Sequence, residues 1–242
     1  MAKGTQGRDP GEAPARRASD RGRYGRLSRE RVLTSALELV DRDGLSALSM
    51  RRLGAELGVE AMALYRYAAS KDALLDGLVE ALHLELEERL TADAVAAREW
   101  RAELGRVARA TYDVCLAHPQ VVPLLSTRML AVPLARRPLA TLRHHERVLS
   151  LLQEAAGLDA QRAAAVFRAF TAWVLGYVSV ELQAMVDNPD EPDPAFRLGL
   201  HHMPPQELPR LRAAAPALAE RGGPEGLVAG LDALLDRFSG EA

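Results

Sequence analysis

Residues 27–82 constrain the fold most strongly, because several helix starts and one tight glycine turn fall within this short stretch. Ser28 and Ser49 are residue types that cap helix N-termini, while Gly44 and Gly58 are typical of helix ends. Apolar residues recur at spacings of three and four after Ser28, as on one face of an amphipathic helix. The pattern predicts three short helices, at about 28–44, 49–56 and 60–67. The last two form a helix-turn-helix.

The rest of the chain also has helical periodicity, and no segment alternates convincingly as a strand does. Ser70 caps a fourth helix whose apolar stripe continues to Leu90, so this helix is expected to connect the first three to the remainder of the chain. The fold class is therefore all-α, with a three-helix head and a larger helical body. The further helices are predicted at about 99–116, 121–130, 138–155, 159–187, 205–220 and 224–239.

Three parts of the chain are distinguished by composition. Residues 1–26 have almost no large apolar side chains and are predicted to be a disordered basic arm. This arm either contacts DNA or is a solvated tail without a role. Residues 27–73 form the helix-turn-helix domain, and residues 74–242 the helical domain for effector binding and dimerisation. Within the latter, 74–93 is the connector and 187–204, rich in Asp, Pro and His, a long mobile loop.

Charge is unevenly distributed, although the net formal charge is only -2. Residues 1–75 carry 14 Lys and Arg against 10 Asp and Glu, so the basic end coincides with the helix-turn-helix, as nucleic-acid binding requires. Cys115 is the single cysteine, which fits a reducing cytoplasm. The apolar stretch 169–180 is shorter than the roughly 20 residues that span a bilayer, so we expect a core helix and no membrane partner.

The third helix of the head is expected to enter the major groove of DNA. Arg66 suits guanine or phosphate, while tyrosine hydroxyls suit phosphate. Lys71 begins the fourth helix, where free amides and the helix dipole favour a phosphate. Ala61 and Ala63 can make few contacts with base edges, so sequence specificity is expected to depend partly on DNA shape. The predicted DNA-binding residues are Arg51, Ala61, Met62, Ala63, Tyr65, Arg66, Tyr67 and Lys71.

The head resembles the N-terminal domain of TetR-family transcriptional regulators. The residues that carry the resemblance are Arg31 to Val40, Gly44-Leu45, Ser49 to Leu53, Leu57-Gly58-Val59, Ala63 to Tyr67 and Ser70 to Leu75. The resemblance implies an all-α homodimer, the DNA-facing positions named above, and a ligand-binding body whose last long helices form a dimeric four-helix bundle. Two departures, Gly54 for the common Ala and Ala68 for a frequent aromatic, suggest a looser head.

The body resembles that of tetracycline repressors at Leu125 to Arg128 and at Val174 to Val178. Leu124 and Glu87 stand where those proteins have the histidines that bind the metal and the drug, so tetracycline is not expected as the effector. A largely apolar organic molecule is expected instead, because the candidate cavity is aromatic with one polar anchor. The predicted cavity residues are Trp100, Tyr112, Thr127, Arg128, Met129, Phe170, Trp173 and Tyr177.

The last helix and the end of the long apolar helix suggest an intermolecular seam, with packing on the chain's own core as the alternative. The predicted dimer residues are Leu182, Met185, Leu227, Leu231, Leu234, Leu235 and Phe238. The pair His144-His145 points about 100° apart on a helix and is not expected to chelate a metal. No catalytic constellation and no cofactor are predicted.

The sequence therefore favours a ligand-responsive repressor that binds a palindromic operator of double-stranded DNA as a homodimer. A small-molecule-binding protein or enzyme that keeps the head only for packing is the alternative from another class. An activator is a third, since the sign of regulation depends on where the operator lies. A palindrome upstream of a neighbouring gene would favour the first, and turnover of a ligand the second.

Overall fold

The computed structural model describes residues 27–92, 99–183, 188 and 190–239. The predicted arm at 1–26 lies outside them. The head consists of α1 (Arg29–Asp43), the 3-10 turn η1 (Leu45–Ala47), α2 (Met50–Leu57) and α3 (Ala61–Leu64). Ser28 and Ser49 accept hydrogen bonds from the amides of Arg31 and Arg52, which confirms both predicted caps. The third helix is shorter than predicted, because a turn replaces it after Leu64.

Two glycines let the helices of the head approach closely. A Cβ on Gly54 would lie 2.8 Å from the carbonyl oxygen of Val59, and one on Gly77 would collide with the side chain of Leu33. Ala68 is buried, with only 3% of its surface exposed. The expectation of a looser head is therefore wrong at Gly54, because a Cβ there would meet the backbone of Val59 and Ala61.

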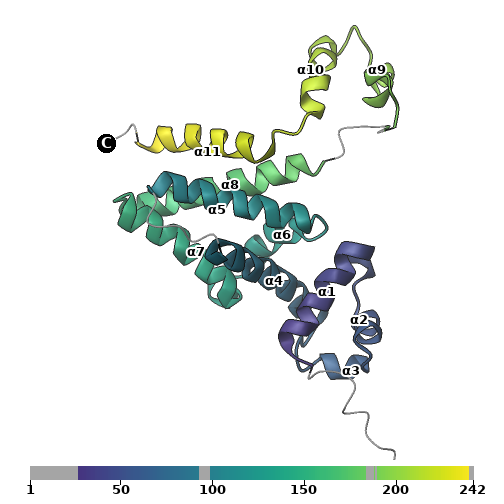
Figure 1. Ribbon diagram of the computed structural model, residues 1–242, viewed down its shortest axis with the longest axis vertical. Helices are drawn as coiled ribbons and strands as arrows, with labels where there is room; N and C mark the ends of the chain where they lie inside the picture. Colours follow the sequence, from purple (N-terminus) through teal and green to yellow (C-terminus); the bar gives the residue numbers. More distant parts are fainter. Residues whose placement is uncertain (1–26, 93–98, 184–187, 189, 240–242) are drawn as a thin grey trace, which may run out of the picture.

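The connector α4 (Lys71–Ala92) runs from the head into the body, as predicted (Figure 1). The body contains α5 (Trp100–Ala117), α6 (Val122–Ala131), the 3-10 turn η2 (Leu134–Arg136) and α7 (Leu139–Ser150). A π-helical turn, η3 (Leu151–Ala155), continues α7. Two further long helices complete it, α8 (Ala160–Glu181) and α11 (Gly223–Ser239). No strand occurs in the residues that the structure describes, and the fold is all-α as predicted.

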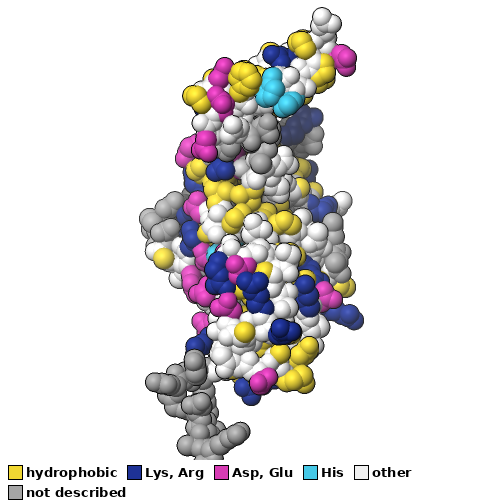
Figure 2. Space-filling view, turned by 90° about the vertical axis from the view of Figure 1, so that its right-hand side faces the viewer, with side chains coloured by type: hydrophobic (Ala, Val, Ile, Leu, Met, Phe, Trp, Pro, Cys, Tyr) yellow, Lys and Arg dark blue, Asp and Glu magenta, His cyan; other side chains and the backbone are white. Residues whose placement is uncertain are grey.

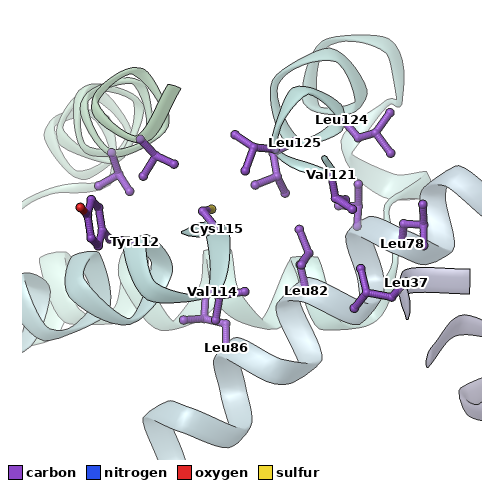
Figure 3. Close-up of a cluster of buried hydrophobic side chains, with 14 of the residues drawn as sticks. Leu37, Leu78, Leu82, Leu86, Tyr112, Val114, Cys115, Val121, Leu124 and Leu125 are labelled. Carbon is purple, nitrogen blue, oxygen red and sulfur yellow. The ribbon is translucent and has the colours of Figure 1, made fainter. Parts of the chain in front are cut away.

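The core continues from the head into the body without a break. Leu37 of α1 lies beside Leu78 of α4, and Leu82 and Leu86 continue the α4 stripe toward α5 and α6 (Figure 3). Val121 and Leu124 cover the same region from the start of α6. One apolar cluster therefore includes residues of both parts.

Helices α8 and α11 pack through aromatic residues seated on glycines. A Cβ on Gly230 would collide with the ring of Trp173, and one on Gly226 would lie 2.5 Å from the hydroxyl oxygen of Tyr177. The Trp173 Nε1–H donates to the carbonyl of Leu227 at 2.9 Å. At the other end, buried Glu181 accepts the amide of Gly222 at 2.9 Å and so caps the start of α11.

The outer face of α8 is uncovered within this chain. Val166, Phe170 and Val174 are buried, whereas Ala172 and Gly176 are exposed. The sequence predicted a core helix over this apolar stretch, and in the structure neighbouring helices cover only one side of it. By length and composition, α8 is the one described helix that passes a test for a membrane span, a test that core helices also pass.

The described residues of the predicted loop 187–204 contain two short helical turns, and a longer helix follows inside the helix predicted at about 205–220. α9 (Pro194–Arg197), η4 (Leu200–His202) and α10 (Pro209–Ala219) project from the body in Figure 1. We call residues 190–219 the projecting segment. It exposes four large apolar side chains, and these are Phe196, Leu208, Leu211 and Leu218.

Candidate DNA-binding face and ligand cavity

The outer surface of the head presents most of the predicted DNA-binding side chains to solvent. Met62 is 77% exposed and Tyr65 44% exposed. Arg51, Arg66 and Lys71 are exposed, and the structure forms no ion pair between these three and any described carboxylate. Ala61 and Ala63 are half-buried. Lys and Arg side chains lie over the lower part of the surface in Figure 2.

Other arginines of the head are engaged in ion pairs. The Arg42 guanidinium donates to Asp43 at 3.0 Å and to Glu56 at 2.5 Å, while Arg52 donates to Asp43 at 2.8 Å. The carboxylates raise the pKa of Arg42. These pairs join α1 to α2 and leave Arg51, Arg66 and Lys71 as cations available to phosphate.

Tyr67 faces the head rather than solvent. Its hydroxyl donates to the carbonyl of Leu27 at 2.6 Å, and Arg29 donates to the carbonyl of Tyr67 at 2.6 Å. The Arg66 guanidinium carbon lies 4.9 Å from the centre of the Tyr67 ring. The expectation that the Tyr67 hydroxyl is available to phosphate is corrected, because its proton is bound internally and the ring positions Arg66.

A small cavity of about 50 Å³ lies between α4, α5, α6, α7 and α8. Three histidines, two threonines and five apolar residues line it. The polar members are His83, Thr111, His144, His145 and Thr171, and the apolar members are Leu86, Leu125, Phe170, Val174 and Leu175.

The three histidines are held in their neutral form. Burial lowers the pKa of His83, that of His144 to about 3 and that of His145 to about 4. The ring centroid of His144 is 5.4 Å from that of His83 and 6.2 Å from that of His145, so each charge would oppose the next. In the described residues no group of three metal-binding side chains is placed to hold an ion.

Most of the predicted cavity residues lie elsewhere, and of the seven whose side chains the structure describes, Phe170 alone lines this cavity. Arg128 pairs with Asp72 at 2.8 Å, and Thr127 donates back to its own helix at Pro123. Tyr112 donates to Glu181 at 3.0 Å, which with burial raises its pKa to about 12. Trp173 and Tyr177 donate to backbone carbonyls of Leu227 and Gly223. Trp100 packs half-buried against the core, and the Met129 side chain lies outside the described residues.

Three of the predicted dimer residues are buried in the chain's own core. Leu227, Leu231 and Leu235 are at most 1% exposed, because this face of α11 packs on α5 and α8. The structure therefore corrects these three and favours the alternative of packing on the core. Leu182 and Leu234 are half-buried, Phe238 is 40% exposed, and Met185 lies outside the described residues.

Sequence reasoning missed His83, His144 and His145 as cavity residues. It weighed His144 and His145 only as a chelating pair, for which their directions on the helix are unsuitable. The available signal was that His83 directly follows Leu82 in the apolar stripe of α4, whereas His144 and His145 lie between Arg143 and Glu146. A neutral buried imidazole can form hydrogen bonds with a ligand as well as bind a metal.

Residues 32–78 match the family model described as bacterial regulatory proteins of the tetR family. Residues 95–236 match the model described as the tetracycline-repressor-like C-terminal domain. The HTH-type transcriptional repressor DrrR1 of Streptomyces coeruleorubidus is 33% identical over 150 residues, 62% of this chain and 52% of that protein. The chain therefore spans about half the length of that relative.

Solved structures share the fold. A possible TetR-family regulator from Streptomyces coelicolor A3(2) has a TM-score of 0.68 and 27% identity, with 89% of this chain and all of that chain covered. The Streptomyces coelicolor protein ActR in complex with actinorhodin has a TM-score of 0.68 at 24% identity, with 89% and 98% covered, and shows the fold alone. With the head and body models matching in order, the chain belongs to the TetR family of helix-turn-helix transcriptional regulators.

Proposed function

We propose that this chain is a dimeric repressor that binds a palindromic operator and is released by a small, largely apolar organic effector. Residues 27–73 act as the DNA-binding unit, and residues 74–242 bind the effector and the second copy. The predicted mobility of 187–204 and the DNA role of the basic arm remain parts of this proposal. A relative described as a transcriptional repressor and a fold neighbour solved with a small molecule support it.

The observation that carries the proposal is that one helix serves both sites. α4 begins at Lys71 on the DNA face and continues to His83 and Leu86 in the wall of the cavity. Twelve residues of helix separate Lys71 from His83, or about 18 Å at 1.5 Å per residue. A ligand that shifts α4 by a small angle therefore displaces the end that binds phosphate. A differential affinity of about 1–3 kcal/mol suffices for a 5- to 150-fold change in occupancy.

DNA binding is tested by fluorescence anisotropy with DNA from the region flanking the gene. We expect the double variant Arg66→Ala with Lys71→Ala to bind more weakly and to show a shallower dependence on salt, by about one unit for each lost phosphate contact. Arg42→Ala is the matched control, because Arg42 is an exposed head cation already paired with two carboxylates. Equal binding by wild type and the double variant at moderate salt would contradict the assigned face.

Effector response is tested by a thermal-shift screen followed by operator release. A ligand at 100 times its dissociation constant should add about 2.7 kcal/mol to stability. The same ligand should weaken operator binding. A promoter fusion then separates repression from activation, and a ligand that stabilises the body without changing operator affinity would argue against coupling.

Dimerisation is supported by apolar surface that this chain does not cover. The outer face of α8 exposes Ala172, Gly176 and Val180, and a hydrophobic band crosses the body at this height in Figure 2. The projecting segment adds further exposed apolar side chains. Single exposed apolar residues are normal on a monomer, whereas a contiguous apolar surface marks an interaction site. Two heads on a symmetric dimer would meet half-sites about one helical turn apart.

A further inference from the structure

The wall of the cavity is rich in hydrogen-bond acceptors. The Nδ1 of His83 lies 2.7 Å from the carbonyl oxygen of Val79, and Thr141 Oγ1 lies 3.3 Å from the same nitrogen. Because a carbonyl only accepts, we assign the ring proton to Nδ1. A neutral imidazole then has a lone pair on Nε2, which is an acceptor.

Thr111 and His144 provide two further polar atoms. The Thr111 hydroxyl donates to the carbonyl of Val107 at 2.8 Å, so its oxygen keeps only lone pairs for a ligand. His144 Nδ1 is buried and has no hydrogen-bond partner among the described residues. A buried polar atom without a partner is costly, and a ligand that supplies one recovers that cost.

No charged side chain belongs to the described lining of the cavity. The two arginines that act electrostatically on His144 and His145 are already engaged: Arg147 is bound by both oxygens of Glu87 at 3.0 and 2.7 Å, and Arg137 donates to the carbonyl of Val132. An ionised ligand would therefore lose its hydration without meeting an opposite charge in the wall. Protonation of the histidines in response to an anion is opposed by burial and by their closeness to one another.

We propose that the effector is a neutral molecule with an apolar skeleton whose hydroxyl group donates a hydrogen bond to His83, with Thr111 and His144 as neighbouring partners. A phenol is the simplest such group, since at neutral pH it keeps its proton. This inference rests on the proposed function, because it names the chemical class that fills the same cavity.

The test compares four probes of one skeleton: 2-naphthol, 2-methoxynaphthalene, naphthalene and 2-naphthoate. The methoxy compound is one methyl group larger than the phenol and has no proton to donate, and the carboxylate adds a charge. Titration by intrinsic fluorescence or calorimetry at pH 7 gives the four dissociation constants. We expect 2-naphthol to bind about 2- to 13-fold more tightly than 2-methoxynaphthalene, the range of one net hydrogen bond. We expect 2-naphthoate to bind most weakly.

Two variants locate the acceptor. His83→Phe should bring the affinity ratio of 2-naphthol to 2-methoxynaphthalene close to one. Thr111→Val is the second variant, because it removes one oxygen with little change in volume and should reduce the ratio in part. The ratio in the wild-type protein tests the proposal without any variant.

Several results would overturn the inference. These are equal binding of the phenol and its methyl ether, tightest binding of the carboxylate, lack of binding by all four probes, or a micromolar Zn²⁺ site that His144→Gln removes. Operator binding is measured separately on the unliganded protein. If the operator binds and another chemical class releases it, the proposed function stands and this inference fails. If no operator is bound, the proposed function fails whatever the probes do.

Discussion

The imidazole Nε2 of His118 lies 2.7 Å from Oε2 of Glu85, which connects the end of α5 to the connector helix α4. On the other side of the ring, Nδ1 lies 2.6 Å from a carboxylate oxygen of Asp41 in α1. One side chain thus joins head, connector and body. Burial would raise the pKa of Glu85, but hydrogen bonds with Arg89 and His118 outweigh it and lower that pKa.

We expect His118→Ala to lower the free energy of unfolding by about 1–3 kcal/mol, because both carboxylates lose a hydrogen-bonding partner. It should also weaken the coupling between ligand and operator binding, since the three parts share this contact. Urea unfolding and operator anisotropy with and without ligand measure the two effects. His201→Ala, at an exposed histidine of the projecting segment, is the control and should change neither.

The contact of Trp173 with Gly230 gives a second prediction. Gly230→Ala should destabilise the protein by about 1–3 kcal/mol, because the new methyl group overlaps a ring that is held by its bond to Leu227. Gly105→Ala is the matched control in the facing helix, since a Cβ there would lie 3.6 Å from Val228, an ordinary contact. Helix propensity alone then makes Gly105→Ala neutral or stabilising by up to about 1 kcal/mol. Equal urea midpoints for the two variants would contradict the proposed packing.

The head was predictable from sequence because its signals are local. Ser28, Ser49 and Gly58 act on the backbone within three residues, and each occupies its predicted cap. The cavity could not be predicted from sequence, because its wall comes from five helices. Whether an aromatic ring faces a cavity or a glycine depends on the partner helix. Trp173 was assigned to the cavity but sits over Gly230, a relationship that no periodicity contains. The close approach at Gly54 was missed for the same reason.

Acid should destabilise this protein before its carboxylates titrate. The pKa of His144 falls to about 3 in the fold, well below its ordinary value of 6.5. Below pH 6.5 the unfolded chain binds a proton that the folded chain does not, so stability falls as pH falls. One such histidine lowers the free energy of unfolding by about 2 kcal/mol between pH 7 and pH 5. Urea unfolding at both values should show this loss, and His144→Gln should reduce it, whereas His201→Gln should leave it unchanged.

The outer face of α8 predicts the effect of a charge on the oligomeric state. Ala172→Arg should convert a dimer into a monomer, because the guanidinium would be buried in the interface without a partner. Leu139→Arg is the control, since Leu139 is 60% exposed on another helix, α7. Sedimentation equilibrium measures the mass of each variant. If Ala172→Arg forms a dimer with an unchanged dissociation constant, the interface lies on a surface other than the outer face of α8.

Cys115 reports on opening of the core. Its thiol is 1% exposed, and burial raises its pKa to about 12, so at pH 8 roughly one molecule in ten thousand carries a thiolate. We expect a thiol reagent such as iodoacetamide to label the native protein far more slowly than the chain unfolded in guanidinium.

Cys115 lines a small cavity that shares His83, Leu86, Thr111 and Leu125 with the ligand cavity. A bound ligand should therefore slow labelling further, by up to the factor by which it stabilises the fold. Rapid labelling of the native protein, unaffected by ligand, would show that this part of the core opens independently of the cavity.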